Sequence, residues 1–131
     1  MKVMEVNTLR SNTQVYNHRL MSQSLVPIKL YRLVDGLKRN LLESRNNLNS
    51  IVLSNRQDKK TVLMAVNEAV EVESVQADDS VTIQLIEGKV RFKANKQLVV
   101  LMKGQLLKVS EKTPYSLTSI EQSVILLTIV S

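Results

Sequence analysis

The sequence predicts a mostly β protein: an antiparallel β-barrel or jelly roll that follows a partly helical N-terminal extension. Two patterns support this fold class. From residue 50 onward, apolar and polar residues alternate in short runs, which is the pattern of half-buried strands. Turn-forming residues separate these runs at intervals of about 8–12 residues, a spacing typical of sandwiches and barrels. Since no room remains between the runs for crossover helices, the sheets are expected to be largely antiparallel.

The length and composition indicate one globular domain. The chain has 131 residues, of which 44% are hydrophobic and 23% charged, and this suits a folded protein with a single core. We divide it into residues 1–49, an N-terminal arm and helix, and residues 50–131, the β-barrel. The first 25 residues are polar and predict a loose arm, with one short strand or helical turn within 3–6 or 15–21.

Residues 28–44 fit two structures. Their apolar positions follow helical spacing, and Pro27 suits the first turn of a helix. Asp35-Gly36 in the middle is also a hairpin signal, and glycine inside a helix costs about 1 kcal/mol relative to alanine. We favour a helix that caps the barrel or supplies a dimer contact, and the hairpin stays open as the alternative.

The expected strands come after a loop. Residues 45–47 and 49–50, rich in asparagine, predict that loop. The segment 62–66 is apolar throughout, which predicts a strand buried on both faces, whereas 70–73 alternates valine with glutamate and predicts a half-exposed strand. The full set of expected strands is 51–53, 62–66, 70–73, 81–86, 89–93, 98–102, 106–109, 117–120 and 124–130. The turns between the later strands contain Glu87-Gly88, Asn95-Lys96 and Lys103-Gly104.

The positive charge of the chain is concentrated in its N-terminal half. The formal net charge is +6, but residues 1–60 carry +7 and residues 61–131 carry −1. A basic face can attract nucleic acid or anionic lipid. However, no block of five or six like charges occurs, and the few aromatic residues do not cluster as they do in single-strand binders. We interpret the charge as a solvated surface and expect no nucleic-acid partner; a nucleic-acid-associated regulator that uses the basic half is kept as an alternative.

The residue types that are missing exclude several kinds of chemistry. The chain has no cysteine, no tryptophan and a single histidine, His18, so disulfides, thiolate zinc sites, iron–sulfur clusters and cysteine nucleophiles are excluded. A catalytic triad or a multi-histidine metal centre would depend on His18 alone. The N-terminus has no apolar signal-peptide segment, and the longest apolar run is far shorter than the roughly 20 residues of a membrane span. We expect a cytoplasmic protein that has no membrane partner.

Four segments of the β half together resemble the motifs of small bacterial cupins. Residues 81–90 contain a Glu-Gly turn followed by an alternating strand, as at the end of the first cupin motif. Residues 104–109 resemble the glycine turn and strand that open the second motif, Pro114-Tyr115 stands where the family has Pro-His, and 121–129 resembles its closing strand. The resemblance covers about 70 residues and implies a cupin-type double-stranded β-helix, which commonly forms homodimers.

The same resemblance implies that the metal site of the family has been lost. Its glutamate position falls at Val81, and its two first-motif histidines fall at Val75 and Ala77 or, with a longer spacer, at residues 74 and 76. The second-motif histidine position is Tyr115. Transition metals in such a site need converging imidazole and carboxylate donors, and none of these residues supplies one. We therefore expect no metal, no cofactor and no catalytic residue carried over from the family.

An apolar interior follows from these replacements. Val81 and Ile83 share one face of a strand, and together with Val75, Ala77 and Tyr115 they are the candidate lining of a small pocket. The alternative is a barrel filled with side chains. We expect a metal-free, non-catalytic domain that binds a small ligand or acts through homodimerisation. A metal-independent isomerase or epimerase that uses Tyr115 as its acid is kept as an alternative, although no barrel histidine is available as its base.

Overall fold

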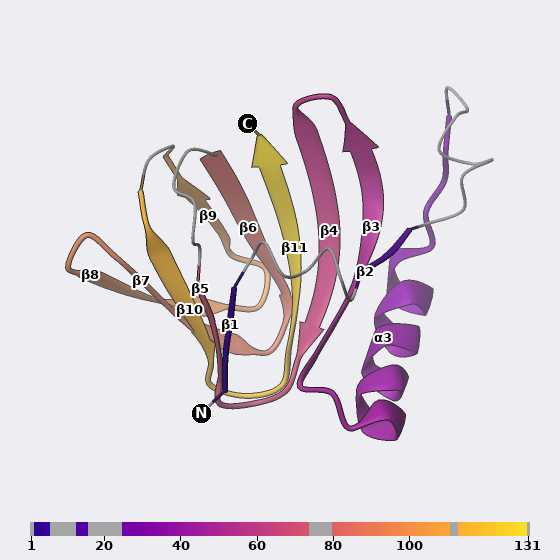
Figure 1. Cartoon of the computed structure of the whole chain (residues 1–131), viewed down its shortest axis with the longest axis horizontal. Helices are drawn as coiled ribbons and strands as arrows, with labels where there is room; N and C mark the ends of the chain where they lie inside the picture. Colours follow the sequence, from indigo (N-terminus) through magenta and orange to yellow (C-terminus); the bar gives the residue numbers. More distant parts are fainter. Residues whose placement is uncertain (1, 6–12, 16–24, 74–79, 111–112, 131) are drawn as a thin grey trace.

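A computed structural model describes residues 2–5, 13–15, 25–73, 80–110 and 113–130 of the chain. In these residues two β-sheets face each other, and one helix lies against the outside of the larger sheet (Figure 1). The prediction of a mostly β, largely antiparallel jelly roll with a helical N-terminal part is confirmed. No helix within the described ranges is long and apolar enough to cross a membrane.

The smaller sheet has five strands and the larger sheet has six. The five strands lie in the order β1 (Lys2–Glu5), β5 (Val70–Glu73), β10 (Tyr115–Ser119), β7 (Lys89–Ala94) and β8 (Gln97–Met102). The six lie in the order β2 (Thr13–Val15), β3 (Leu48–Arg56), β4 (Lys59–Val66), β11 (Ser123–Val130), β6 (Ser80–Glu87) and β9 (Leu106–Val109). The edge strands β1 and β2 pair in parallel with β5 and β3, and the other neighbours are antiparallel.

Strand β4 is buried on both faces from Val62 to Val66, as the unbroken apolar sequence of that part predicts. Val62, Met64 and Val66 belong to the core between the sheets. Leu63 and Ala65 belong to a second apolar cluster, which the helix covers. Both faces are shielded because the facing sheet packs on one side and the helix on the other. Strand β5, by contrast, buries its valines and leaves its glutamates at least partly exposed, and this half-exposed pattern is also as predicted.

The helix α3 (Leu30–Ser44) confirms the helical interpretation of this segment, and the hairpin alternative is wrong. Its buried side chains Val34, Leu37 and Leu41 recur at helical spacing and pack on the outer face of β3, β4 and β11. Gly36 does not interrupt the helix because it is exposed, and a Cβ added there would meet no atom within 4 Å. Packing of the apolar face of α3 against the sheet stabilises the helix, and this outweighs the local preference of Asp-Gly for a turn.

The loop expected before the first long strand is shorter than predicted. Asn49 and Ser50, which were expected in that loop, are buried residues of β3. The strand runs for nine residues and pairs with β4 along most of its length, with one irregularity between Val52 and Ser54. Asn49 and Ser50 pair with Ala65 and Met64 in the apolar part of β4. This pairing draws the two polar residues into the sheet, an effect of tertiary structure that local propensity does not predict.

The hairpin of β7 and β8 forms one end of the smaller sheet. Asn95 and Lys96, which connect the strands, both have positive φ, at 49° and 64°, as two-residue hairpin turns of right twist require. Strand β8 is an edge strand, and four of its six residues are apolar yet exposed. These exposed residues are Leu98, Val99, Val100 and Met102.

Candidate functional site

The described residues of the predicted pocket come together in the interior of the sandwich. Val81 and Ile83 on β6 and Tyr115 on β10 belong to one core cluster, with 4%, 0% and 9% of their surfaces exposed. The two sheets contribute facing side chains to this cluster. Val75 and Ala77, the other predicted lining residues, lie outside the described residues.

Tyr115 is packed as a core residue. Its ring stacks on that of Phe92, with centroids 5.1 Å apart and an angle of 21° between the planes. Offset stacking of this kind adds to the burial of apolar surface. The position where the cupin pattern has a histidine is therefore filled by an aromatic pair from β7 and β10.

A cavity of about 200 Å³ opens near the hairpin end of the sandwich. Its apolar wall consists of Phe92, Val99, Leu107, Val109 and Ala94. Its polar lining consists of Asn95, Gln97, Lys108, Ser110 and Thr113. An apolar wall with a few polar groups is the composition of a ligand site, and the volume is small enough to suit a molecule of about one ring.

The predicted residues lie behind this cavity rather than on its surface. In the pairing of β6 with β9, Val81 is opposite Val109 and Ile83 is opposite Leu107. Val99, Leu107 and Val109 line the cavity but were not among the predicted lining residues. Their segments, 98–102 and 106–109, are apolar at almost every position, so no alternation in the sequence marks which residues face the interior.

The residues present do not fit the metal of the cupin pattern. Of its predicted ligand positions, those that the structure describes hold Val81 and Tyr115, which offer neither imidazole nor carboxylate donors. No three His, Cys, Asp or Glu residues in the described part of the chain gather into a metal-binding group. The chemistry of this interior is consequently that of apolar contact with a polar rim.

The outer face of the five-stranded sheet carries its charges in separate rows. Lys89, Arg91 and Lys93 on β7 form the cation row, and Glu71 and Glu73 on β5 form the acid row. Strand β10 lies between them with two hydroxyl side chains pointing to the same face. Lys93 and Glu73 both pair with Ser116, and Arg91 and Glu71 both pair with Thr118. The two rows are thus about 10 Å apart, two strand spacings.

A shallow groove of about 450 Å³ lies on this outer face. Glu71, Glu73, Lys93 and Ser116 line it, and Tyr115 borders it. The isomerase alternative needs a polar, open space beside Tyr115, and this groove is such a space. Because the ring of Tyr115 packs into the core, however, the isomerase alternative stays a hypothesis.

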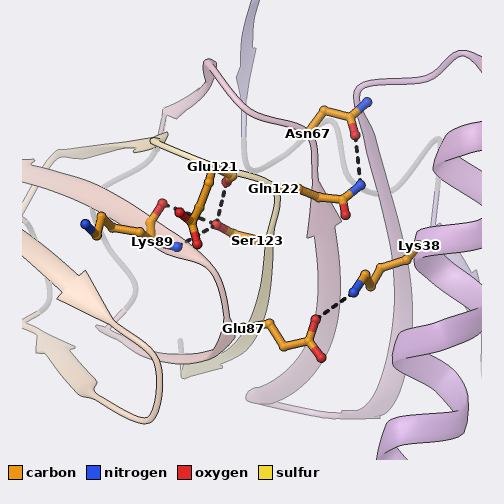
Figure 2. Close-up of polar contacts among 7 residues, drawn as sticks. All are labelled: Lys38, Asn67, Glu87, Lys89, Glu121, Gln122 and Ser123. Atoms are coloured by element: carbon orange, nitrogen blue, oxygen red, sulfur yellow. Dashed lines mark hydrogen bonds and ion pairs between the residues drawn. The ribbon is translucent and has the colours of Figure 1, made fainter.

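Polar contacts at the opposite end of the sandwich hold its connections together (Figure 2). Ser123 Oγ accepts a hydrogen bond from the backbone N–H of Lys89 at 3.1 Å and donates to the carbonyl of Glu121 at 2.8 Å. Lys38 of α3 forms an ion pair of 2.8 Å with Glu87 at the end of β6. These contacts fix the turn between the two sheets and tie the helix to the larger sheet.

Comparisons with known proteins identify the fold. No protein-family model matches the sequence, and no curated protein matches it. Among solved structures, the cupin_2 domain of an XRE family transcriptional regulator from Enterobacter cloacae superposes with a TM-score of 0.60 at 13% identity, covering 66% of this chain and 98% of that one. The cupin domain of Cnp3 from Schizosaccharomyces pombe gives 0.60 at 13% identity, over 66% of each chain.

A larger enzyme shares the same fold. Salicylate 1,2-dioxygenase from Pseudaminobacter salicylatoxidans superposes with a TM-score of 0.69 at 16% identity, covering 86% of this chain. This chain spans only 41% of that enzyme. At such identities the comparisons establish the fold, and the resemblance to small cupins that the motifs predicted is confirmed at that level.

Proposed function

We propose that this chain, which has the cupin fold, is a metal-free, non-catalytic domain that binds a small, weakly polar ligand in the cavity at the hairpin end of its sandwich. The cavity itself is the observation that carries the proposal. Phe92 and Val109 form its buried apolar wall, with 4% and 6% of their surfaces exposed. Apolar contact there supplies the affinity.

The polar lining gives the ligand its orientation. Gln97 and Thr113 can donate and accept hydrogen bonds, and among the described lining residues Lys108 supplies the one charged group, an ammonium. A single-ring compound with one polar substituent matches a cavity that has an apolar wall and a polar rim. Its ring would lie against Phe92 and its substituent at the rim. A cavity of about 200 Å³ is below the range of drug-sized ligands, about 300–1,000 Å³.

Binding to this cavity is tested with p-cresol as the probe, and it is followed by NMR of the valine methyl groups in the full chain. We expect shifts at Val99 and Val109, and loss of binding in Val99→Phe, which fills the cavity. Val100→Phe is the matched control, because Val100 is the next residue of β8, points to the other face and is similarly exposed, at 43% against 39%. Equal binding by both variants, or no shift at either valine, would contradict the proposal.

Homodimerisation is the second candidate role, and the charge rows favour it. Three cations follow one another on one face of β7 at about 7 Å, and neither Arg91, Lys93, Glu71 nor Glu73 forms an ion pair within the described ranges. Consider a second copy that packs face to face on this sheet, related by a 180° rotation about an axis that lies between the two faces and runs parallel to β10. Each cation row would then lie over the acid row of the other copy. Arg91 would then face Glu71 of the second copy, because both residues lie level with Thr118.

Apolar side chains border the same face. Leu98, Val100 and Met102 pair with Lys93, Arg91 and Lys89 in the β7–β8 hairpin, so they point outward with the cation row. Between 43% and 59% of their surfaces are exposed. Face-to-face packing of two sheets at about 10 Å would cover part of this surface in each copy.

Charge reversal tests this arrangement by light scattering after size exclusion at low salt. We expect the wild type to be a dimer, and Arg91→Glu/Lys93→Glu and Glu71→Lys/Glu73→Lys each to be monomers. Mixing the two variants should restore a dimer, since a face that is acidic except for Lys89 then meets an all-basic one. Lys29→Glu/Arg39→Glu controls for net charge, because both residues are exposed, Lys29 just before α3 and Arg39 on it. A monomeric wild type, or variants that dimerise on their own, would exclude this interface.

A further inference from the structure

A second cavity lies between the helix and the sheet, away from the sandwich interior. It is a cleft of about 200 Å³, lined by Arg32, Leu33, Gly36, Leu37, Asn40, Asn49 and Ile51. The first five of these residues lie on α3, and the last two lie on β3. Gly36 carries no side chain that could close the cleft, and a Cβ in its place would meet no atom within 4 Å.

A buried polar group in this cleft has no hydrogen-bond partner among the described residues. Asn49 is 91% buried, with 9% of its surface exposed, and its side-chain nitrogen Nδ2 makes no hydrogen bond with the described part of the chain. Leaving a buried donor unsatisfied costs about 1–3 kcal/mol, and nearly all such groups in native proteins have a partner. An acceptor atom in the cleft would satisfy it.

The other lining groups specify the kind of acceptor. The guanidinium of Arg32 offers only donors, and Arg32 forms no ion pair within the residues that the structure describes. No aspartate or glutamate is among the described residues that line the cleft, so no carboxylate of this lining repels an anion. Leu33, Leu37 and Ile51 supply apolar contact beside these donors.

We propose that the cleft between α3 and β3 binds a small carboxylate. One carboxylate oxygen accepts from Asn49 Nδ2, and the guanidinium of Arg32, which matches a carboxylate in a forked geometry, approaches from the rim. The hydrocarbon part of the ligand lies against Leu33, Leu37 and Ile51. The cleft has the volume for a short-chain acid and not for a larger metabolite.

The experiment titrates the full chain with butyrate and follows the side-chain amide resonances of Asn49 by NMR. Butyramide has the same shape without the charge, and inorganic phosphate has charge without the hydrocarbon. We expect butyrate to shift the Asn49 resonances and to bind about tenfold or more tightly than either control, as a charge-assisted hydrogen bond implies. Equal binding of butyrate and butyramide, or no shift of Asn49, would overturn the proposal and leave a water molecule as the occupant.

Two variants test the roles of the donors. Asn49→Leu keeps the branching of the side chain and places apolar groups in an apolar cluster, so the fold is retained while butyrate affinity falls about tenfold or more. Arg32→Gln is expected to weaken butyrate binding but not butyramide binding, whereas Arg39→Gln, an exposed cation of the same helix outside the cleft, changes neither. Unchanged affinity in Asn49→Leu, with the fold verified by circular dichroism, would also overturn the proposal.

Discussion

Gly88 lies directly against Ser123, with the turn that passes from the larger sheet to the smaller one packed on the start of β11. Gly88 has a φ of +95°, and a Cβ built on it would lie 2.5 Å from the carbonyl oxygen of Gln122 and 2.7 Å from the Cα of Ser123. These neighbours are backbone atoms, which cannot rotate away. The approach brings Ser123 Oγ within reach of the backbone N–H of Lys89 at 3.1 Å. Glycine at this turn therefore permits both the left-handed conformation and the contact between the two connections.

Replacing Gly88 by alanine is expected to destabilise the protein by about 3 kcal/mol, because it adds both left-handed strain and a backbone clash. Urea unfolding followed by circular dichroism measures this cost. Gly104 is the matched control, since its φ is also positive, at +86°, but its Cβ would meet nothing within 4 Å. Gly104→Ala should consequently cost less. Equal costs for the two variants would show that packing against Ser123 contributes nothing.

The hydroxyl of Ser123 is expected to contribute separately from the glycine. Ser123 is fully buried, and the loss of its hydroxyl in Ser123→Ala leaves the N–H of Lys89 without a side-chain acceptor. We expect a loss of about 1–3 kcal/mol in the free energy of unfolding. Ser116→Ala, at a partly exposed position on β10, should change stability by less than about 0.5 kcal/mol. A neutral Ser123→Ala variant would contradict this role.

The proposal that the chain binds no cupin metal is open to direct measurement. Val81 and Tyr115 stand at predicted ligand positions, and neither binds a divalent transition metal well at neutral pH. Elemental analysis of the purified protein is expected to find no stoichiometric iron, manganese, nickel or zinc. One metal ion per chain that survives dialysis against a chelator would refute the metal-free interpretation.

The spacing of apolar residues within each strand and within the helix was enough to predict most of the fold. The alternation of 81–86 and 89–93 follows from burial of every second residue, and the structure buries Val81, Ile83, Leu85, Val90 and Phe92. The helix was predictable because Val34, Leu37 and Leu41 share one face. The pattern within one segment does not show which strand that segment pairs with. For this reason Asn49 and Ser50 were assigned to a loop, although they lie in β3.

The core positions of the candidate pocket residues could be predicted, but the lining of the sandwich cavity could not. Counting from the glycine turns located Val81, Ile83 and Tyr115, and these residues do face the interior. The cavity lies one strand further on, because β9 pairs with β6 and brings Leu107 and Val109 to the surface that the ligand would meet. That pairing joins segments about 25 residues apart in the sequence, and its register depends on how both sheets close.

The ion pair between Lys38 and Glu87 joins α3 to the end of β6 at 2.8 Å. Their side chains are 36% and 32% exposed, so solvent screens the pair and a coupling of about 0.5 kcal/mol is expected. A double-mutant cycle with Lys38→Met and Glu87→Gln measures it by urea unfolding, and the methionine preserves the packing of the lysine stem. The coupling should fall as salt is raised. A coupling above about 2 kcal/mol that salt does not change would indicate a buried pair instead.

Replacing Gly36 by alanine is expected to have the opposite effect on stability to replacing Gly88. It lies in the exposed part of α3, and a Cβ there would meet nothing within 4 Å. Alanine restricts the unfolded chain and favours the helix, so Gly36→Ala is expected to stabilise the protein by about 0.5–1 kcal/mol. Thermal unfolding should show a rise of a few degrees in Tm. Asp35→Ala, at the neighbouring exposed position, removes the other half of the turn signal but no backbone freedom, and should give a smaller gain. A loss of stability in Gly36→Ala would mean that the helix needs glycine at this position for a contact beyond the described residues.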